Sequence, residues 1–393
     1  MKVTLSEVTT LTPGFAFKSK DFKNGNMPVL KIADIQGQVR CSNVSKVNTD
    51  AYTHAKLEKY LVKPGDCLVA MTGNTIGKIG RVSEGTGLIN QRVLKINPAD
   101  NKILDSEYLW GLLQLNSFHR HIINHIDSHS AQPNISASSI GKFSFDLPEL
   151  NTQIKISKIL ASIRKKAELN NRINDYLSEI GGALFSHEIL ESIDDTWLRA
   201  SLLDIASYKN GLAMQKYRPE KDDPGLPVLK IKELAQGQCA ADAERCRSDI
   251  DESVKIFDGD LIFSWSGTLL LDFWAGGNAG LNQHLFKVTS KKYKQWFYYF
   301  WTNYHMRKFI TLAKDRATTM GHIKRSALAE SEVYIPNENK MNELDKLFDP
   351  LIKKIISLKI ESRILSELRN ELLPKLMSGE IDVCKVGVLV ERL

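Results

Sequence analysis

Residues 27–32 read MPVLKI and residues 226–231 read LPVLKI, so the two segments differ only at their first position. A near-identical hexapeptide in both halves of a chain indicates an internal repeat, and further matches follow it in the same order. The later pairs are PGDCL at 64–68 with DGDLI at 258–262, NQRVLK at 90–95 with NQHLFK at 282–287, QPNI at 132–135 with MGHI at 320–323, and DLP at 146–148 with YIP at 334–336. The sequence therefore predicts two diverged copies of one globular fold.

Each copy ends in a long segment whose apolar residues recur at three- and four-residue steps. In the first segment these are Ile156, Leu160, Ile163, Ala167, Ile173, Leu177, Ile180 and Leu184, and in the second they are Leu344, Leu347, Leu351, Ile355, Leu358, Leu365, Leu372 and Leu376. This spacing places one apolar stripe along a helix, as in a coiled coil. Because neither stripe is stable in water and their lengths are similar, we expect the two helices to pair antiparallel.

Two features interrupt the first stripe. Asn170 falls on it, either as a partly exposed position or as a polar residue that sets the register of the helix pair. Gly181 and Gly182 interrupt the first helix where the second reads Leu373-Pro374. We therefore expect the two helix ends to differ.

The globules combine strands and helices. Short apolar and β-branched runs predict strands at 29–35, 67–72 and 92–96 in the first copy, and at 228–234, 261–265 and 285–289 in the second. Each copy then carries one amphipathic helix, at 106–126 and at 294–313. The aromatic run 296–301 of the second helix could stack on bases, but at helical spacing we favour a core role. The fold class is α+β, as two similar globular domains joined by two long antiparallel coiled-coil helices with pseudo-twofold symmetry.

The composition favours a protein of the cytoplasm without a membrane segment. The chain has 393 residues and no apolar run of the roughly 20 residues that cross a bilayer, and its first residues lack the apolar core of a signal peptide. Five scattered cysteines form no C-x-x-C pair, which disfavours zinc sites and disulfides. The net charge of +7 permits a polyanionic partner without requiring one.

The segment AMTGNTIGKIGRV, residues 70–82, has the composition of a phosphate-binding loop. A Walker loop needs four residues between its glycines and a hydroxyl after the lysine. Here three residues separate Gly73 from Gly77, Ile79 follows the lysine, and the second copy (SWSGTLLLDFWAGG, 264–277) does not contain the Gly-Lys pair. We interpret the segment instead as a strand that leads into a turn of small polar residues, with a tip that differs between the copies.

Two variable globules on a rigid spacer are suited to reading a split DNA site, because two readers separated by a rod can reach sites about one helical turn apart. In this arrangement and in its repeated motifs the chain resembles the specificity subunits of type I restriction–modification systems. The resemblance covers nearly the whole chain and rests on the ordered motif pairs, the two proline-ended globules, and the helices that finish as SHEI and SGEI.

The resemblance implies a non-catalytic, sequence-specific DNA-binding subunit. Each target-recognition domain would read one half of a bipartite site in double-stranded DNA, while the helices set the spacer and dock two methyltransferase subunits. Restriction/translocase subunits complete the complex. The resemblance implies that S-adenosylmethionine, ATP and magnesium bind to these partner subunits and that this chain binds no cofactor. The domains would span 1–150 and 191–338, the helices 151–190 and 339–380, and a C-terminal tail 381–393.

Lysine and arginine suit phosphates, while Arg, Lys, Asn, Gln and His suit base edges. In the first domain the predicted DNA contacts are Lys31, Thr72, Asn74, Lys78, Arg81, Gln91, Arg92, Gln132 and Asn134. In the second they are Lys230, Lys232, Ser264, Ser266, Gln283, His284, Lys314, Arg316, Thr319, His322, Lys324 and Arg325. Asn90 and Asn282 are identical in both copies, which favours a role in the fold or in a shared backbone contact.

Two other functions stay open. A self-contained DNA enzyme such as a nuclease could use Asp258, Asp260 and Asp272 to hold a metal, although the copy of the Asp258-Gly259-Asp260 turn keeps one acid only. The other is a coiled-coil scaffold whose globules bind protein, which would show no salt-dependent affinity for duplex DNA even beside a methyltransferase partner.

Overall fold

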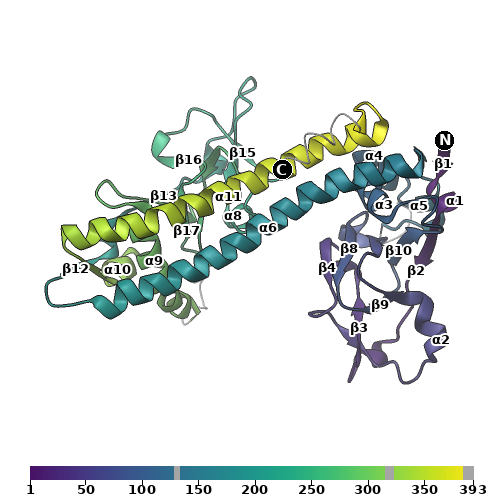
Figure 1. Ribbon diagram of the computed structural model, residues 1–393, viewed down its shortest axis with the longest axis horizontal. Helices are drawn as coiled ribbons and strands as arrows, with labels where there is room; N and C mark the ends of the chain where they lie inside the picture. Colours follow the sequence, from purple (N-terminus) through teal and green to yellow (C-terminus); the bar gives the residue numbers. More distant parts are fainter. Residues whose placement is uncertain (128–132, 315–322, 384–393) are drawn as a thin grey trace. The chain divides into compact units, whose positions relative to one another are not determined.

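The computed structural model describes residues 1–127, 133–314 and 323–383, and the chain divides into two compact units. Unit 1 comprises Met1–Arg164 and Leu368–Leu393, and unit 2 comprises Lys165–Glu367. Each unit therefore holds one globule and part of both long helices (Figure 1). No helix of the described residues is long and apolar enough to cross a membrane.

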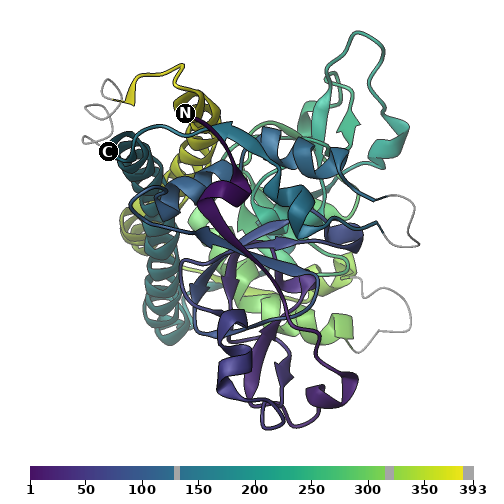
Figure 2. The same cartoon turned by 90° about the vertical axis from the view of Figure 1, so that its right-hand side faces the viewer.

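Unit 1 contains a five-stranded sheet of order β2-β10-β7-β8-β4, a four-stranded sheet of order β5-β3-β9-β6, and the pair β1-β11 (Figure 2). Its strands are β1 Lys2–Thr4, β2 Thr9–Pro13, β3 Met27–Leu30, β4 Gly37–Arg40, β5 Lys46–Val47, β6 Leu61–Val62, β7 Cys67–Ala70, β8 Ile79–Glu84, β9 Gly87–Ile89, β10 Val93–Pro98 and β11 Ser144–Asp146. Its short helices are α1 Leu5–Val8, α2 His54–Leu57, α3 Ser106–Leu113, α4 Asn116–Asn124 and α5 Ala137–Gly141. The central strand β7 is buried along its whole length, as its CLVA sequence requires.

Unit 2 repeats this topology with the orders β13-β20-β17-β18, β15-β14-β19-β16 and β12-β21. Its strands are β12 Leu198–Ser201, β13 Ser207–Asn210, β14 Leu226–Leu229, β15 Arg245–Cys246, β16 Lys255–Ile256, β17 Leu261–Ser264, β18 Leu270–Phe273, β19 Ala279–Leu281, β20 Leu285–Thr289 and β21 Glu332–Ile335. Its helices other than the long pair are α7 Leu202–Ile205, α8 Ile231–Gln236, α9 Gln295–Lys314 and α10 Arg325–Ala329. Apart from the edge strand β4 of unit 1, the second order matches the first strand by strand, so the α+β fold and its duplication are confirmed.

Two local expectations are wrong. The strands expected at 29–35 and 228–234 end early, because residues 32–34 form a 3₁₀ turn and residues 231–236 form α8. In unit 1 the chain goes on to the edge strand β4, which has no counterpart among the described strands of unit 2. The single helix expected at 106–126 is two helices, α3 and α4, with Gln114 and Leu115 between them.

The long helices are α6, Leu150–Glu188, and α11, Glu338–Ser378. Within unit 2 they run antiparallel, since Asn170 Nδ2 donates to Glu361 Oε2 at 2.8 Å and Lys340 Nζ donates to Glu188 Oε2 at 3.0 Å. Asn170 is 1% exposed, so it is a buried polar residue of the seam rather than a partly exposed one. Ile180 and Leu347, expected on the apolar stripes, are exposed.

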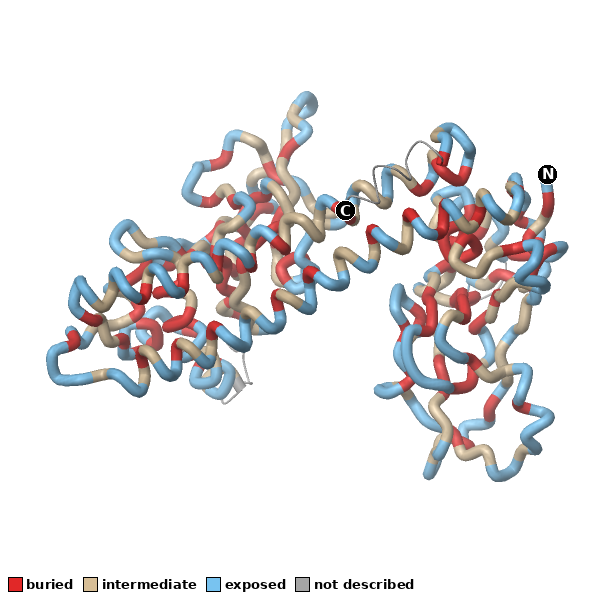
Figure 3. The backbone as a smooth tube through the Cα atoms, in the orientation of Figure 1, coloured by how far each residue is buried: buried red, intermediate tan, exposed pale blue. Residues whose placement is uncertain are grey.

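The aromatic run of α9 lies in the core of unit 2, which confirms the core interpretation. Trp296, Phe297 and Trp301 are at most 1% exposed. The Trp296 ring stacks on Phe348 of α11 with centroids 4.7 Å apart, and its Nε1 donates to Asp345. Buried positions recur along the two long helices (Figure 3). Truncating one such aromatic would cost about 3–5 kcal/mol, so these rings hold the globule of unit 2 to the helices.

A glycine faces a larger residue where each globule meets the long helices. In unit 1 the glycine belongs to the globule, and in unit 2 it belongs to the long helix. In unit 1 a Cβ on Gly111 of α3 would lie 3.3 Å from Leu373 of α11. In unit 2 the large residue is Phe300 of α9, and a Cβ on Gly181 of α6 would lie 2.6 Å from its Cζ. Gly181 thus admits a ring, and α6 continues through both glycines to Glu188, so the expected interruption is wrong.

Replacing Gly181 by Ala is expected to destabilise unit 2 by about 1–3 kcal/mol, because the new methyl overlaps the Phe300 ring in a packed core. Gly182→Ala is the matched control, since no atom lies within 4 Å of its Cβ position. That variant should gain up to about 1 kcal/mol from helix propensity. Urea unfolding of both proteins gives the comparison.

Adding Phe300→Leu to the Gly181→Ala protein removes the overlapping ring tip, so the two changes should cost less together than their sum. Equal gains for both alanine variants, or strict additivity in the double variant, would contradict the tight packing of Gly181 on the ring.

Candidate nucleic-acid interface

Three segments that are distant in the sequence meet at one end of the five-stranded sheet in unit 1. They are the β7–β8 connection (71–78), the β9–β10 turn (90–92) and the segment before α5 (133–135), together called loop cluster 1. The Met71 amide donates to Arg92 O at 2.9 Å, and the Ile135 amide donates to Met71 O at 3.0 Å. The Gly73 amide donates to Pro133 O at 3.0 Å. Backbone hydrogen bonds therefore hold the loops together and leave the side chains at their tips available.

Unit 2 builds the same arrangement from 265–268, 282–284 and 323–325, together called loop cluster 2. The Ile323 amide donates to Trp265 O at 3.0 Å, as Ile135 does to Met71 in unit 1. The Trp265 amide donates to His284 O at 3.4 Å. The two clusters thus share one backbone plan.

The residues that the two copies share form this plan. The backbone N–H groups of Asn90 and Asn282 donate to Leu30 O and Leu229 O, and these leucines are the last residues of β3 and β14. Gly14 and Gly211 lie against these turns so closely that a Cβ would come within 2.1 Å and 2.2 Å of backbone carbonyl oxygens. This geometry supports a structural role for the repeated Asn90 and Asn282.

The tips of loop cluster 1 are polar and accessible. Asn74, Lys78, Gln91 and Arg92 are exposed. Lys78 Nζ reaches Gln36 Oε1 at 3.5 Å. The sequence prediction missed Gln36, because nothing in its surroundings marks it as a neighbour of Lys78.

Arg92 combines exposure with backbone strain. Its φ is 79°, in the left-handed region that disfavours residues with a Cβ. Its guanidinium makes no hydrogen bond or ion pair with the residues that the structure describes. Strain of this kind costs of order 1–3 kcal/mol and concentrates at functional positions. Arg92 is therefore the strongest individual candidate in the cluster.

Loop cluster 2 presents different chemistry. The half-buried rings of Trp265 and His284 lie with centroids 6.0 Å apart, and Gln283 Nε2 lies 3.3 Å from His284 Nε2. Lys324 and Arg325, at the start of α10, are exposed. Cationic and amide tips in unit 1 thus correspond to aromatic, imidazole and cationic tips in unit 2.

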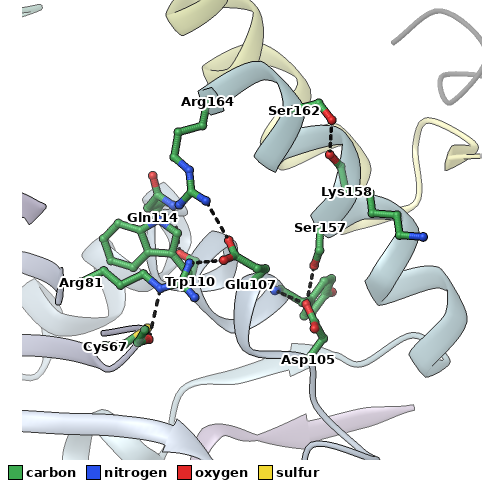
Figure 4. Close-up of polar contacts among 12 residues, drawn as sticks. Cys67, Arg81, Asp105, Glu107, Trp110, Gln114, Ser157, Lys158, Ser162 and Arg164 are labelled. Carbon is green, nitrogen blue, oxygen red and sulfur yellow. Dashed lines mark hydrogen bonds and ion pairs between the residues drawn. The ribbon is translucent and has the colours of Figure 1, made fainter. Parts of the chain in front are cut away.

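Several predicted contact residues have partners inside the protein. Arg81 is 7% exposed, with its Nη1 2.6 Å from Glu107 Oε1 (Figure 4). Lys230 Nζ lies 2.5 Å from Glu244, and Lys31 Nζ donates to Ser45 Oγ at 3.0 Å. Thr72, Ser264 and Ser266 are buried, Asn134 is half-buried and Lys232 is exposed. Gln132, Arg316, Thr319, His322 and the side chain of Lys314 lie outside the described residues.

Each of the three aspartates considered for a metal site forms an ion pair with a lysine or arginine of the chain. Asp258 pairs with Arg363 at 2.7 Å, Asp260 with Lys287 at 2.8 Å, and Asp272 with Lys359 at 2.6 Å. At the start of β7, burial raises the pKa of the Cys67 thiol to about 12, so its thiolate is scarce at neutral pH. The geometry of these three aspartates gives the nuclease hypothesis no support.

Comparison with known proteins places this architecture in a family. The chain is 23% identical to the MjaIX type I restriction enzyme specificity subunit of Methanocaldococcus jannaschii over 325 residues, which cover 75% of this chain and 73% of the relative. It is 24% identical to the Escherichia coli EcoBI specificity subunit over 49% of this chain and 41% of the relative. The crystal structure of the type I restriction–modification S subunit from M. genitalium shares the fold, with a TM-score of 0.51, 16% identity and 96% of each chain covered. The type I restriction modification DNA specificity domain matches residues 1–179 and again 194–369, and the chain belongs to this family.

Proposed function

We propose that this chain is the DNA-reading, non-catalytic subunit of a type I restriction–modification complex, in which each loop cluster contacts one half of a two-part target. The observation that carries the proposal is the division within each unit: the repeated residues form the backbone plan, and the tips differ. Two similar scaffolds with different tips are suited to recognising two different short sequences.

Within the clusters, the exposed or half-buried polar tips are the proposed DNA contacts. These are Asn74, Lys78, Gln91 and Arg92 in unit 1, and Gln283, His284, Lys324 and Arg325 in unit 2. An arginine fork can donate two hydrogen bonds to guanine in the major groove, and amides can pair with adenine. Buried Arg81, Thr72, Ser264 and Ser266 would support the loops from below.

The remaining chemistry would come from partners. The long helices would dock two methyltransferase subunits, which use S-adenosylmethionine, and restriction subunits would supply ATP- and magnesium-dependent cleavage in the cytoplasm. Binding of this chain to DNA would include salt-dependent contacts with the DNA phosphates.

Base-resolved methylation sequencing tests the reading role. The chain is expressed with its partner methyltransferase in a host that lacks the system, and the partner alone serves as the control. We expect N6-methyladenine in one gapped, two-part motif only when the chain is present. Methylation without the chain, or none with a complex that has been shown to assemble, would contradict the proposal.

Replacing Arg92 separates strain from recognition. Arg92→Gly should raise the free energy of unfolding by up to about 1 kcal/mol, because glycine accepts a φ of 79°. It should also weaken recognition of one half-site and leave the other unchanged. Arg92→Lys keeps the charge without the fork, so it should behave like the glycine variant if Arg92 reads a base and like the wild type if it contacts a phosphate. Altered preference at both half-sites would contradict the division between units.

Lengthening both helices tests the spacer. Four residues inserted after Arg164 in α6 and four after Glu367 in α11 add about 6 Å to each helix. The gap between the half-sites should grow by about two base pairs at roughly 3.4 Å each, while both half-sites stay the same. The modified motif, read by sequencing, gives the answer, and altered half-sites would count against the proposal.

A further inference from the structure

An open cleft of about 630 Å³ lies in unit 1, between α4, the start of β8 and the last turns of α11. Its polar lining comes from Gln114, Asn116, Ser117, Arg120, Arg369 and Asn370. No carboxylate belongs to this lining, all of which the structure describes. The cleft therefore offers donors and positive charge to whatever enters it.

Neither arginine of the cleft has an acidic partner among the described residues. Arg120 is exposed and makes no ion pair there. Arg369 is half-buried, and its Nη2 donates to the neutral Asn370 Oδ1 at 2.8 Å. Burial, and to a smaller degree the charge of Arg164, lower the pKa of Arg369. A guanidinium held partly desolvated beside a second one favours an anion as its partner.

Arg369 also departs from the pattern of its helix. Position 369 lies on the apolar stripe, because it is four residues after Leu365 and three before Leu372. In the other repeat the matching position is Leu177, which packs against the core of unit 2. Residues that break a local rule mark functional positions more often than others. The arginine thus replaces packing with charge in unit 1 alone.

The cleft and loop cluster 1 share neighbouring residues of β8 and α4. Ile79, which lines it, directly follows Lys78. A Cβ on Gly77 would lie 3.2 Å from Ile122 Cγ2 and 3.5 Å from His119 Nδ1, so α4 packs against the tip of the β7–β8 connection. The first turn of α4 also lacks a side-chain cap, which adds the positive end of a helix dipole to the two arginines.

We propose that Arg120 and Arg369 bind a backbone phosphate of duplex DNA in this cleft, beside the half-site that loop cluster 1 contacts. The inference rests on the proposed function and deepens it. Guanidinium forks match phosphate oxygens in geometry and charge. Such a contact fixes the position of the duplex and carries no sequence information.

The test measures affinity of the complex with its methyltransferase for the target duplex and for an unrelated duplex, across salt concentrations. The variants are Arg120→Gln and Arg369→Leu, the second of which installs the residue of the other repeat. Arg40→Gln is the control, because Arg40 is a highly exposed arginine of β4 and its replacement removes the same charge. Thermal unfolding checks that each variant is folded, and Arg120→Gln alters an exposed side chain only.

We expect both cleft variants to weaken binding to the two duplexes by the same factor, several-fold, without changing the methylated motif. The slope of log K against log[salt] should become shallower by about 0.9 for each phosphate that is no longer bound, and the control should leave it unchanged. Unchanged slopes in both variants, with wild-type binding intact, overturn the inference alone. Failure of both folded variants to co-purify with the methyltransferase also overturns it and makes the cleft a protein interface. A wild-type complex that binds neither duplex overturns the proposed function as well.

Discussion

The docking of each globule on the long helices is the constraint on which the rest of the structure depends. The loops of each cluster are held by the sheet, and each sheet is held to α6 and α11 through α3 or α9. At this contact a glycine accepts the larger residue opposite, Gly111 against Leu373 in unit 1 and Gly181 against Phe300 in unit 2. Because the glycine is on the globule in unit 1 and on the long helix in unit 2, each globule fits its own segment of the helices. Placing α9 against Leu373 would set Phe300 against a second large side chain.

Within each unit the backbone plan is protected by contacts that allow little change. Gly14 and Gly211 lie so near the Asn-Gln turns that any side chain would overlap a backbone carbonyl. Asn90 and Asn282 tie the turns to β3 and β14. The exposed tips meet no such limit, since substitutions at exposed sites usually change stability by less than about 0.5 kcal/mol. Recognition can therefore diverge while the fold stays the same.

Repetition made much of this fold predictable from the sequence. The MPVLKI and LPVLKI segments and the apolar stripes indicated two copies and two paired helices, because periodicity reports burial directly. The prediction was weaker where tertiary contacts decide. Residues 231–236 form α8 although the preceding strand pattern continues into them, and Arg81 was expected at a tip but lies buried on Glu107. A single sequence does not show which arginine meets a carboxylate far along the chain. The accessible tips were found because turn composition marks exposed loops, whereas the partners of Lys31 and Lys230 carried no such mark.

The same reasoning explains why the arginine cleft has no sequence motif. Arg120 and Arg369 come from helices that the sequence separates widely, and only the return of α11 to unit 1 brings them together. The signal that existed was negative: a charged residue on a stripe that is otherwise apolar, with a leucine at the matching position of the other repeat. A coiled-coil seam tolerates such a residue when another interaction offsets the missing packing. For Arg369 no carboxylate of the described residues supplies that interaction, and a polyanion outside the chain can.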